Sequence, residues 1–401
     1  MMANLDMEIA AAPKTELRNT ADFSREFDLL LAAARTAPDH ARIDALADAG
    51  IDWRVLLDLA ANHSVRPLVY KGLRETCWRR IPVEMQAAWD EAHQLLTGRN
   101  LFLTGELLRV TAEFHKAGIS IAAVKGPVIA QMAYGDFSLR EFHDLDLLVH
   151  ETDFCRAVEF IERLGYKPFW KLDSRSVLRF LRHMGEYKLT SDFPGVDIDL
   201  HWKPAHDSVA LSPSLSDFPS GFQPVTLAGA SVPTFAPQDL PLYLASQGGG
   251  DQWGDLRRIC DLAEFLRRFP DVDWEPHFQT ARRLGGLRSM LTGLVLARDL
   301  LGAPLPASAD GRIEADATSI RIAKRITRNL SRQLHPGEGF TRYVFQLRAR
   351  QTMRGKIALA SHIFTDRTTE DGSWMMLPRP LWWTYGVLRP LRMAGKLLRR
   401  G

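Results

Sequence analysis

Two aspartates, Asp144 and Asp146, lie one residue apart inside the otherwise apolar run HDLDLLVH (residues 143–150). Such a run is typical of a buried β-strand, in which residues two apart point to the same face of the sheet. Both carboxylates would therefore lie close together, where like charges repel one another and burial of an unpaired charge is costly. A positive group is expected beside them, and the candidates are a metal ion, a basic side chain or bulk water.

The chain is predicted to contain a small α/β unit between two helical regions. Apolar residues recur at three- and four-residue spacing across residues 23–118, and this helical spacing returns after residue 237. Between these regions, apolar runs predict strands at residues 119–126 and 143–150 and a further pair around the turn SDFPG. The glycine-rich stretch GGGDQWGD (residues 248–255) is predicted to be a flexible loop. The predicted fold class is α+β, with a small mixed sheet between helical regions.

The predicted boundaries divide the 401 residues into five parts. These parts are a flexible leader at 1–22, an N-terminal helical region at 23–118, an α/β core at 119–206, a C-terminal helical domain at 207–305 and a basic helical, Trp-rich tail at 306–401. A chain of this length has room for two or three compact units and a sizeable buried core.

Composition narrows the class of protein. The 46% hydrophobic and 25% charged residues are ordinary for a globular protein, and a net charge of +3 disfavours a protein that coats nucleic acid. Three cysteines, Cys77, Cys155 and Cys260, match no metal-ligand spacing and are predicted to be reduced core thiols. The sequence has no secretory signal and no apolar run of the roughly 18 residues that a spanning helix requires. We therefore expect a cytoplasmic protein.

The C-terminal tail is both basic and aromatic. From residue 376 onward it has no acidic residue, and arginines are interleaved with Trp382, Trp383 and Tyr385. A segment of this composition suits an anionic membrane surface and would give the protein a weak contact with the inner membrane face. The alternative, which we favour slightly, is a final helix whose aromatic side chains pack on the helical domain.

A second pair of aspartates two residues apart, Asp197 and Asp199, occurs in the run VDIDLHW. If the strand that carries Asp199 lies beside the first strand, three carboxylates converge on one site, whereas Asp197 is expected to form a surface salt bridge. Mg²⁺ held by carboxylates and substrate phosphates is the common way to neutralise such a cluster, with Mn²⁺ as the alternative. Two ions would clamp the attacking and leaving oxygens, so the pattern predicts phosphoryl or nucleotidyl transfer. His201 and Trp202 are expected to close the strand by packing.

A phosphate-binding turn is expected upstream of these carboxylates. The run VKGPVIAQ places Gly126 between a strand and a helix, where backbone N–H groups and the helix dipole would meet a phosphate. Lys125 would either contact the phosphate or pair with the aspartates, and Arg140 lies in the loop that leads to Asp144. We therefore predict Lys125, Gly126 and Arg140 as nucleotide-binding residues.

These motifs, in this order, resemble the DNA polymerase β-type nucleotidyltransferase superfamily and, within it, a bacterial nucleotidyltransferase family of largely unknown substrate. The similarity spans roughly residues 25–305 and includes LAANHSVRPLVYKGL, DLDLLV, the strand ending DLHW, and LRRICDLA. Two positions depart from the pattern. The superfamily turn is usually Gly-Ser or Gly-Gly where this chain has Lys-Gly-Pro, and relatives tend to carry a histidine where this chain has Gln247.

The resemblance implies a nucleotidyltransferase core embedded between the N-terminal and C-terminal helical regions. It implies transfer of a nucleoside monophosphate from a triphosphate such as ATP to an acceptor hydroxyl, with release of pyrophosphate. Asp144 and Asp146 would hold Mg²⁺, Asp199 would complete the metal site or deprotonate the acceptor, and Gly126 would face the phosphates. The acceptor stays open between a small molecule, a peptide and a protein, and long nucleic acid is disfavoured. The alternative is a non-catalytic module that binds a nucleotide or a partner, which the missing serine after Gly126 supports.

Overall fold

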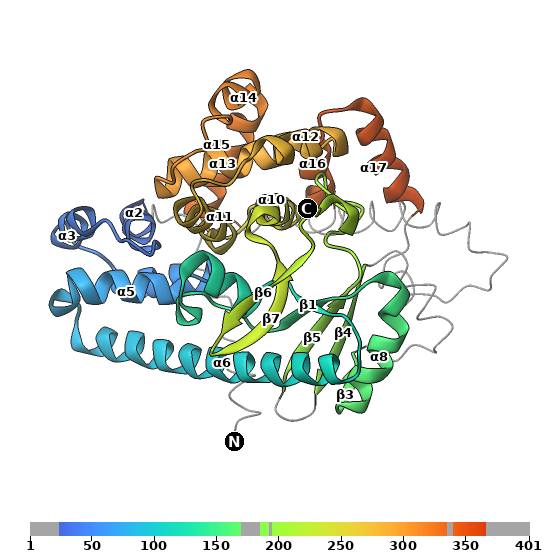
Figure 1. Ribbon diagram of the computed structural model, residues 1–401. Helices are drawn as coiled ribbons and strands as arrows, with labels where there is room; N and C mark the ends of the chain where they lie inside the picture. The colour runs from blue at the N-terminus through green and yellow to red at the C-terminus, as the bar shows by residue number, and fades with distance from the viewer. Residues whose placement is uncertain (1–23, 170–184, 192–194, 335–339, 366–401) are drawn as a thin grey trace.

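The computed structural model describes residues 24–169, 185–191, 195–334 and 340–365 (Figure 1). The predicted leader, the middle of the SDFPG turn and the Trp-rich end of the tail lie outside these residues. In the described part, helices surround a small mixed sheet, so the predicted α+β class is confirmed. The domain boundaries stay predictions.

Five described strands form one mixed sheet in the order β1-β2-β5-β4-β3. They are β1 (Ala122–Ala123), β2 (Leu145–Leu148), β3 (Tyr166–Pro168), β4 (Glu186–Ser191) and β5 (Asp197–His201). Strands β2 and β5 are parallel, and the other neighbouring pairs are antiparallel. The two strands that carry the aspartate pairs are therefore hydrogen-bonded neighbours inside the sheet.

The two faces of this sheet differ in polarity because side chains alternate along each strand. Leu147 of β2 and its register partner Leu200 of β5 are fully buried, and their face packs against α6 (Val83–Lys116) and α8 (Phe154–Arg163). The other face carries the aspartates. A slip of one residue would move the leucines to the polar face and the aspartates into the core, so the apolar contacts specify the register.

The two helical regions are far apart in sequence but share one hydrophobic core. The N-terminal helices before α6 are α2 (Ser24–Ala33), α3 (His40–Asp48), α4 (Trp53–Asn62) and α5 (Arg66–Thr76). The C-terminal helices are α10 (Leu240–Gly250), α11 (Leu256–Arg268), α12 (Glu275–Leu284), α13 (Leu287–Leu301), α14 (Asp310–Ala315), α15 (Ala317–Ser331), α16 (Phe340–Ala349) and α17 (Met353–Thr365). The Thr36 hydroxyl donates a hydrogen bond to Glu264 of α11, and in Figure 1 α2 lies beside α11.

A hairpin that the sequence analysis did not predict, β6 (Phe222–Leu227) and β7 (Ala230–Phe235), packs against β1 and α6. Its core residues Leu227 and Val232 join the cluster beneath the sheet. Pro224 and Pro233 are register partners in the two strands. Because proline cannot donate to a strand ladder, its presence in both segments hid the strand pattern.

The described cysteines have no disulfide partner, but one of them differs from the prediction. Cys77 and Cys260 are buried, whereas Cys155 is exposed because it lies in the first turn of α8 on the side away from the sheet. None of the described helices combines the length and the apolar composition that crossing a bilayer requires, and this includes the long helix α6.

Of the stretch predicted to be a flexible loop, residues 251–255 do form the turn between α10 and α11, but the prediction is wrong for residues 248–250 and for the packing of Trp253. Residues 248–250 form the last turn of α10 and are buried, and the ring of Trp253 is fully buried next to them. A Cβ atom at Gly248 would collide with this ring, and so would one at Gly293 of α13. The glycines therefore make room for the indole between α10 and α13, a packing role that turn propensity does not reveal.

Gly293→Ala should destabilise the protein by about 1–3 kcal/mol, because the added methyl group overpacks against Trp253. Gly105 on α6 provides a matched control, since a Cβ atom there meets open space and Gly105→Ala should stabilise the helix by about 0.5–1 kcal/mol. Urea unfolding measures both free energies. A Gly293→Ala protein as stable as Gly105→Ala would contradict the packing argument.

Candidate active site

Asp146 and Asp199 are register partners on β2 and β5, so their side chains lie on the same face of the sheet. Asp144 directly precedes β2, and the charges of both Asp144 and Asp146 act on Asp199. The structure thus brings together the three carboxylates that the sequence predicted to converge. Their roles stay predictions.

Asp146 is buried and has two partners that compensate its charge. The Lys125 ammonium donates to Oδ1 of Asp146 at 2.6 Å, and Nε2 of His201 lies 2.9 Å from the same oxygen. Burial opposes ionisation of this carboxyl, but Lys125 and His201 outweigh it and hold the pKa of Asp146 well below its usual range. Asp146 is therefore an anion throughout the neutral pH range, and a basic side chain supplies the expected positive group.

Asp199 is in the opposite electrostatic state. Its Oδ1 is buried and has no hydrogen-bond partner in the part of the chain that the structure describes. Burial, together with the charges of Asp146 and Asp144, raises the pKa of Asp199 to about 7. Lys188, its register partner on β4, bonds to Asp197 at 2.7 Å, as expected for an Asp197 salt bridge. Asp199 can therefore exchange a proton near neutral pH.

His201 faces the carboxylates, whereas we expected it to close the strand by packing. It follows Asp199 by two residues on β5 and so lies on the same face. Its Nε2 contacts Asp146, and its Nδ1 lies 3.5 Å from Oε2 of Glu186. Trp202, on the other face, packs against Phe154 as expected. The two-residue spacing between Asp199 and His201 is the sequence signal that could have placed His201 on this face.

Lys125 and Gly126 form the turn between β1 and the short helix α7 (Gly126–Ile129). Gly126 has a φ of +52°, which favours glycine, and Pro127 lies in the first turn of the helix. A Cβ atom at Gly126 would lie 3.6 Å from the carbonyl oxygen of Asp144, so this turn packs directly on the segment that carries the aspartates. The predicted phosphate-facing turn is beside the carboxylates, and its contact with a nucleotide stays a prediction.

Arg140 lies in the protein interior, away from any open surface. Its Nε and Nη2 donate to the two carboxylate oxygens of Asp261 on α11, at 2.7 and 2.9 Å. The Tyr134 hydroxyl donates to the same carboxylate at 2.8 Å. This geometry gives Arg140 a structural role between the core and the C-terminal helices. Its contact with a nucleotide stays a prediction.

Arg257, which the sequence analysis did not single out, contributes positive charge to the site. It lies in the first turn of α11, where the helix dipole disfavours a cation. Its guanidinium lies 3.4 Å from the Glu141 carbonyl and 3.6 Å from Asp255, and its buried Nε has no partner among the described residues. Burial and the charge of Asp146 raise the pKa of Asp144, and Arg257 opposes this shift. Arg257 therefore has donors left for an anion.

No group of three or more His, Cys, Asp or Glu side chains within the described ranges is arranged as a ready metal site. In this arrangement Lys125 and His201 both contact Oδ1 of Asp146. The donor set nevertheless fits a hard cation, because it consists of carboxylate oxygens and includes the unpartnered Oδ1 of Asp199. The metal site stays a prediction that this chemistry supports.

Comparison with known proteins places this geometry in context. A family model described as an uncharacterised nucleotidyltransferase matches residues 49–302 of the chain. Among solved structures, the chain is similar to an antigenic nucleotidyltransferase-like protein from Paracoccidioides brasiliensis. That similarity has 15% sequence identity and a TM-score of 0.33, and it covers 52% of this chain and 95% of the other. A comparison with curated proteins found no match.

Asp199→Asn should reduce the dependence of stability on pH when metal is absent. Because the pKa of Asp199 is raised to about 7, the folded protein retains a proton that the unfolded chain loses above about pH 4. The resulting stability is fully present below about pH 4 and is lost as the pH rises through about 7, by on the order of 4 kcal/mol at most. Urea unfolding in EDTA at about pH 5 and about pH 8 measures this loss. An equal loss in wild type and variant would contradict the raised pKa.

Proposed function

The chain belongs to the family of uncharacterised nucleotidyltransferases, and on that premise we propose that it transfers a nucleoside monophosphate from a triphosphate such as ATP to an acceptor hydroxyl. The observation that supports the proposal most strongly is a pair of carboxylates that lie side by side on β2 and β5 and differ in pKa. Asp146 is a permanent anion, whereas the pKa of Asp199 is about 7. A site that combines a fixed charge with a group that exchanges protons near neutrality suits acid–base chemistry.

Asp199 is the group best suited to accept the proton of the acceptor hydroxyl. A carboxylate with a pKa near 7 is partly ionised at neutral pH and is still basic enough to take a proton. The hydroxyl oxygen would attack the α-phosphorus, the bond to the pyrophosphate group would break, and the hydroxyl proton would pass to Asp199. Oδ1, which has no partner in the described structure, is the atom that would receive it.

Mg²⁺, with two ions as the expected number and Mn²⁺ as the alternative, would be held by Asp144 and Asp146, so that Asp199 stays available to accept the proton. When bound, the metal would neutralise the triphosphate and the leaving pyrophosphate. The Lys125 ammonium and the Arg257 guanidinium act electrostatically on Asp144, and we propose that they bind phosphate oxygens. Gly126 allows the backbone of its turn to lie close to Asp144 and so brings Lys125 to the site.

The alternative function is a module that binds a nucleotide without catalysis. The Lys125–Asp146 ion pair favours it, because the ammonium takes the place at Asp146 that a metal would need. The lack of a serine after Gly126 points in the same direction. The two functions differ in whether nucleotide binding requires a divalent metal.

Replacement of both Asp144 and Asp146 by Asn should abolish Mg²⁺-dependent binding of a nucleoside triphosphate, because the metal would lose both of these carboxylates. Calorimetry with each of the four triphosphates, with Mg²⁺ and with EDTA, measures the binding. Asp197→Asn is the matched control, since this carboxylate lies on β5 but pairs with Lys188, and binding should change less than about threefold. Binding that persists in EDTA and in the double variant would support the non-catalytic module instead.

Arg257→Gln should weaken binding of a triphosphate about tenfold while leaving binding of the corresponding monophosphate nearly unchanged. The reason is that a charge-assisted hydrogen bond to the outer phosphates would be lost. Arg298→Gln is the control, because this arginine is exposed on α13 and pairs with Asp299 at 2.7 Å. Equal weakening of both nucleotides by Arg257→Gln would indicate a structural role and contradict the phosphate contact.

A further inference from the structure

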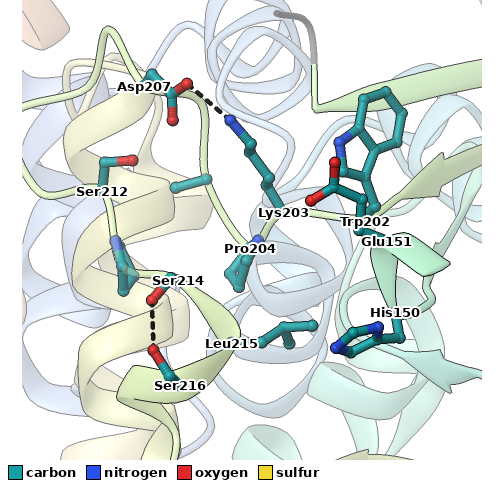
Figure 2. Close-up of a pocket in the computed structure, with 12 residues that line it drawn as sticks. His150, Glu151, Trp202, Lys203, Pro204, Asp207, Ser212, Ser214, Leu215 and Ser216 are labelled. Carbon is teal, nitrogen blue, oxygen red and sulfur yellow. Dashed lines mark hydrogen bonds and ion pairs between the residues drawn. The ribbon is translucent and has the colours of Figure 1, made fainter. Parts of the chain in front are cut away.

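A pocket of about 370 Å³ opens at the carboxyl ends of the parallel strands β2 and β5 (Figure 2). His150 follows the end of β2 by two residues, and Lys203 follows the end of β5 by two. Each of them lies four residues, or roughly 13 Å of extended chain, beyond an aspartate of the site. We propose that this pocket binds the end of the acceptor that lies away from the reacting hydroxyl, and that this end is a small, neutral polyhydroxyl group of sugar-like chemistry. The proposal rests on the proposed function, because an acceptor site has meaning only in a transferase.

The lining is rich in hydrogen-bonding groups but has no excess of positive charge. One wall carries Ser212, Ser214 and Ser216. The Ser214 hydroxyl is already bonded to Ser216 and to Asp217, each at 2.9 Å, so these two serines offer a ligand mainly the acceptor capacity of their oxygens. The ammonium of Lys203 is paired with Asp207 at 2.7 Å, and Glu151 adds a negative charge on the opposite side. A phosphorylated acceptor or a nucleic acid would need cations that are free to pair with phosphate. Hydroxyl groups of a ligand, which both donate and accept, match serine hydroxyls and carboxylates.

The size and the apolar part of the lining also suit a small ring. Pro204 and Leu215 provide apolar surface between the serine wall and His150. A pocket of about 370 Å³ lies at the small end of the range of roughly 300–1,000 Å³ that is typical of small-molecule sites, and it has room for a substituted six-membered ring. A mixed lining of this kind, with a few polar groups on an apolar surface, is typical of sites for small molecules.

Residues 203–214 of the pocket wall form no helix or strand, yet buried side chains fix the backbone of this segment. Gln346 of α16 accepts from the Ala210 N–H at 2.7 Å and donates to the Gly249 carbonyl at 2.8 Å. Nη2 of Arg350 donates to the Val209 carbonyl at 2.9 Å. Both of these polar side chains are buried. Hydrogen bonds of this kind order the wall before a ligand arrives, which is what a binding site requires and a simple connection does not.

Helix α10 holds the same wall from a second direction. The Ser246 hydroxyl donates to the Leu211 carbonyl at 2.9 Å, and Nε2 of Gln247 donates to the Pro204 carbonyl at 2.8 Å. The amide of Gln247 therefore helps to set the position of the pocket wall.

Saturation-transfer NMR on the full chain tests the proposal with four probes: D-glucose, N-acetyl-D-glucosamine, myo-inositol and the anionic control glucose 6-phosphate. We expect saturation transfer from the protein to at least one neutral probe. Ser212→Trp and Ala205→Trp, which fill the pocket from two positions, should each reduce this transfer at least tenfold. Ser231→Trp, at an exposed position of the β6–β7 hairpin, should leave it unchanged. Circular dichroism shows which variants are folded, and two filling variants guard against the failure of one.

Three results would overturn the acceptor site. They are no saturation transfer to any neutral probe, saturation transfer that persists in a folded Ser212→Trp or Ala205→Trp protein, and saturation transfer to glucose 6-phosphate alone. Calorimetric binding of Mg²⁺ and a triphosphate to the same wild-type protein separates this proposal from the proposed function. If the triphosphate binds but no neutral probe shows saturation transfer, only the acceptor site is overturned. If a neutral probe shows saturation transfer but no triphosphate binds, the proposed function is overturned and, with it, the assignment of the pocket to an acceptor.

Discussion

Repulsion between carboxylates on one face of a buried sheet is the constraint on which the site depends. An unpaired anion at the position of Asp146 would cost several kcal/mol, and Lys125 and His201 remove this cost by contacting the same oxygen. Because these partners come from the turn after β1 and from β5, the compensation requires β2 to lie between those two strands, as the sheet order has it. Both partners contact Asp146, so Asp199 keeps an oxygen that has no partner among the described residues, and its raised pKa follows from the same arrangement.

The loop before β2 connects this constraint to the rest of the fold. Arg140 pairs with Asp261 of α11, and the next residue, Glu141, accepts a hydrogen bond from Arg66 of α5 at 2.7 Å. Two consecutive residues therefore attach both helical regions to the segment that places Asp144 three residues later. Loss of one partner of a buried ion pair typically costs about 3–5 kcal/mol. The shared core of the two helical regions thus determines where the first carboxylate of the site lies.

The spacing of residues along a strand was enough to predict which side chains share a face of the sheet. It was not enough to predict contacts between segments that are far apart in the sequence. The convergence of Asp146 and Asp199 followed from two-residue spacing together with one assumption about strand pairing. His201 obeys the same spacing, but its partner became evident only with the register of β2 and β5. The sequence analysis assigned Arg140 to the nucleotide and did not pair it with Asp261. These two residues are 121 positions apart, and no local pattern connects them. The glycines of α10 looked like a loop for a similar reason, since the indole that they accommodate packs against a different helix.

The region that matches the family model and the supports of the proposed acceptor pocket do not coincide. The match covers residues 49–302 and includes the carboxylates and the serine wall, whereas Gln346 and Arg350 lie beyond it. A side chain that bonds the backbone of a pocket wall sets the position of that wall without touching a ligand. Changes after residue 302 would therefore alter the shape of the pocket while the carboxylates stay in place. On the proposed function, chemistry at phosphorus depends on the sheet face, and the choice of acceptor depends on the C-terminal helices that hold the wall.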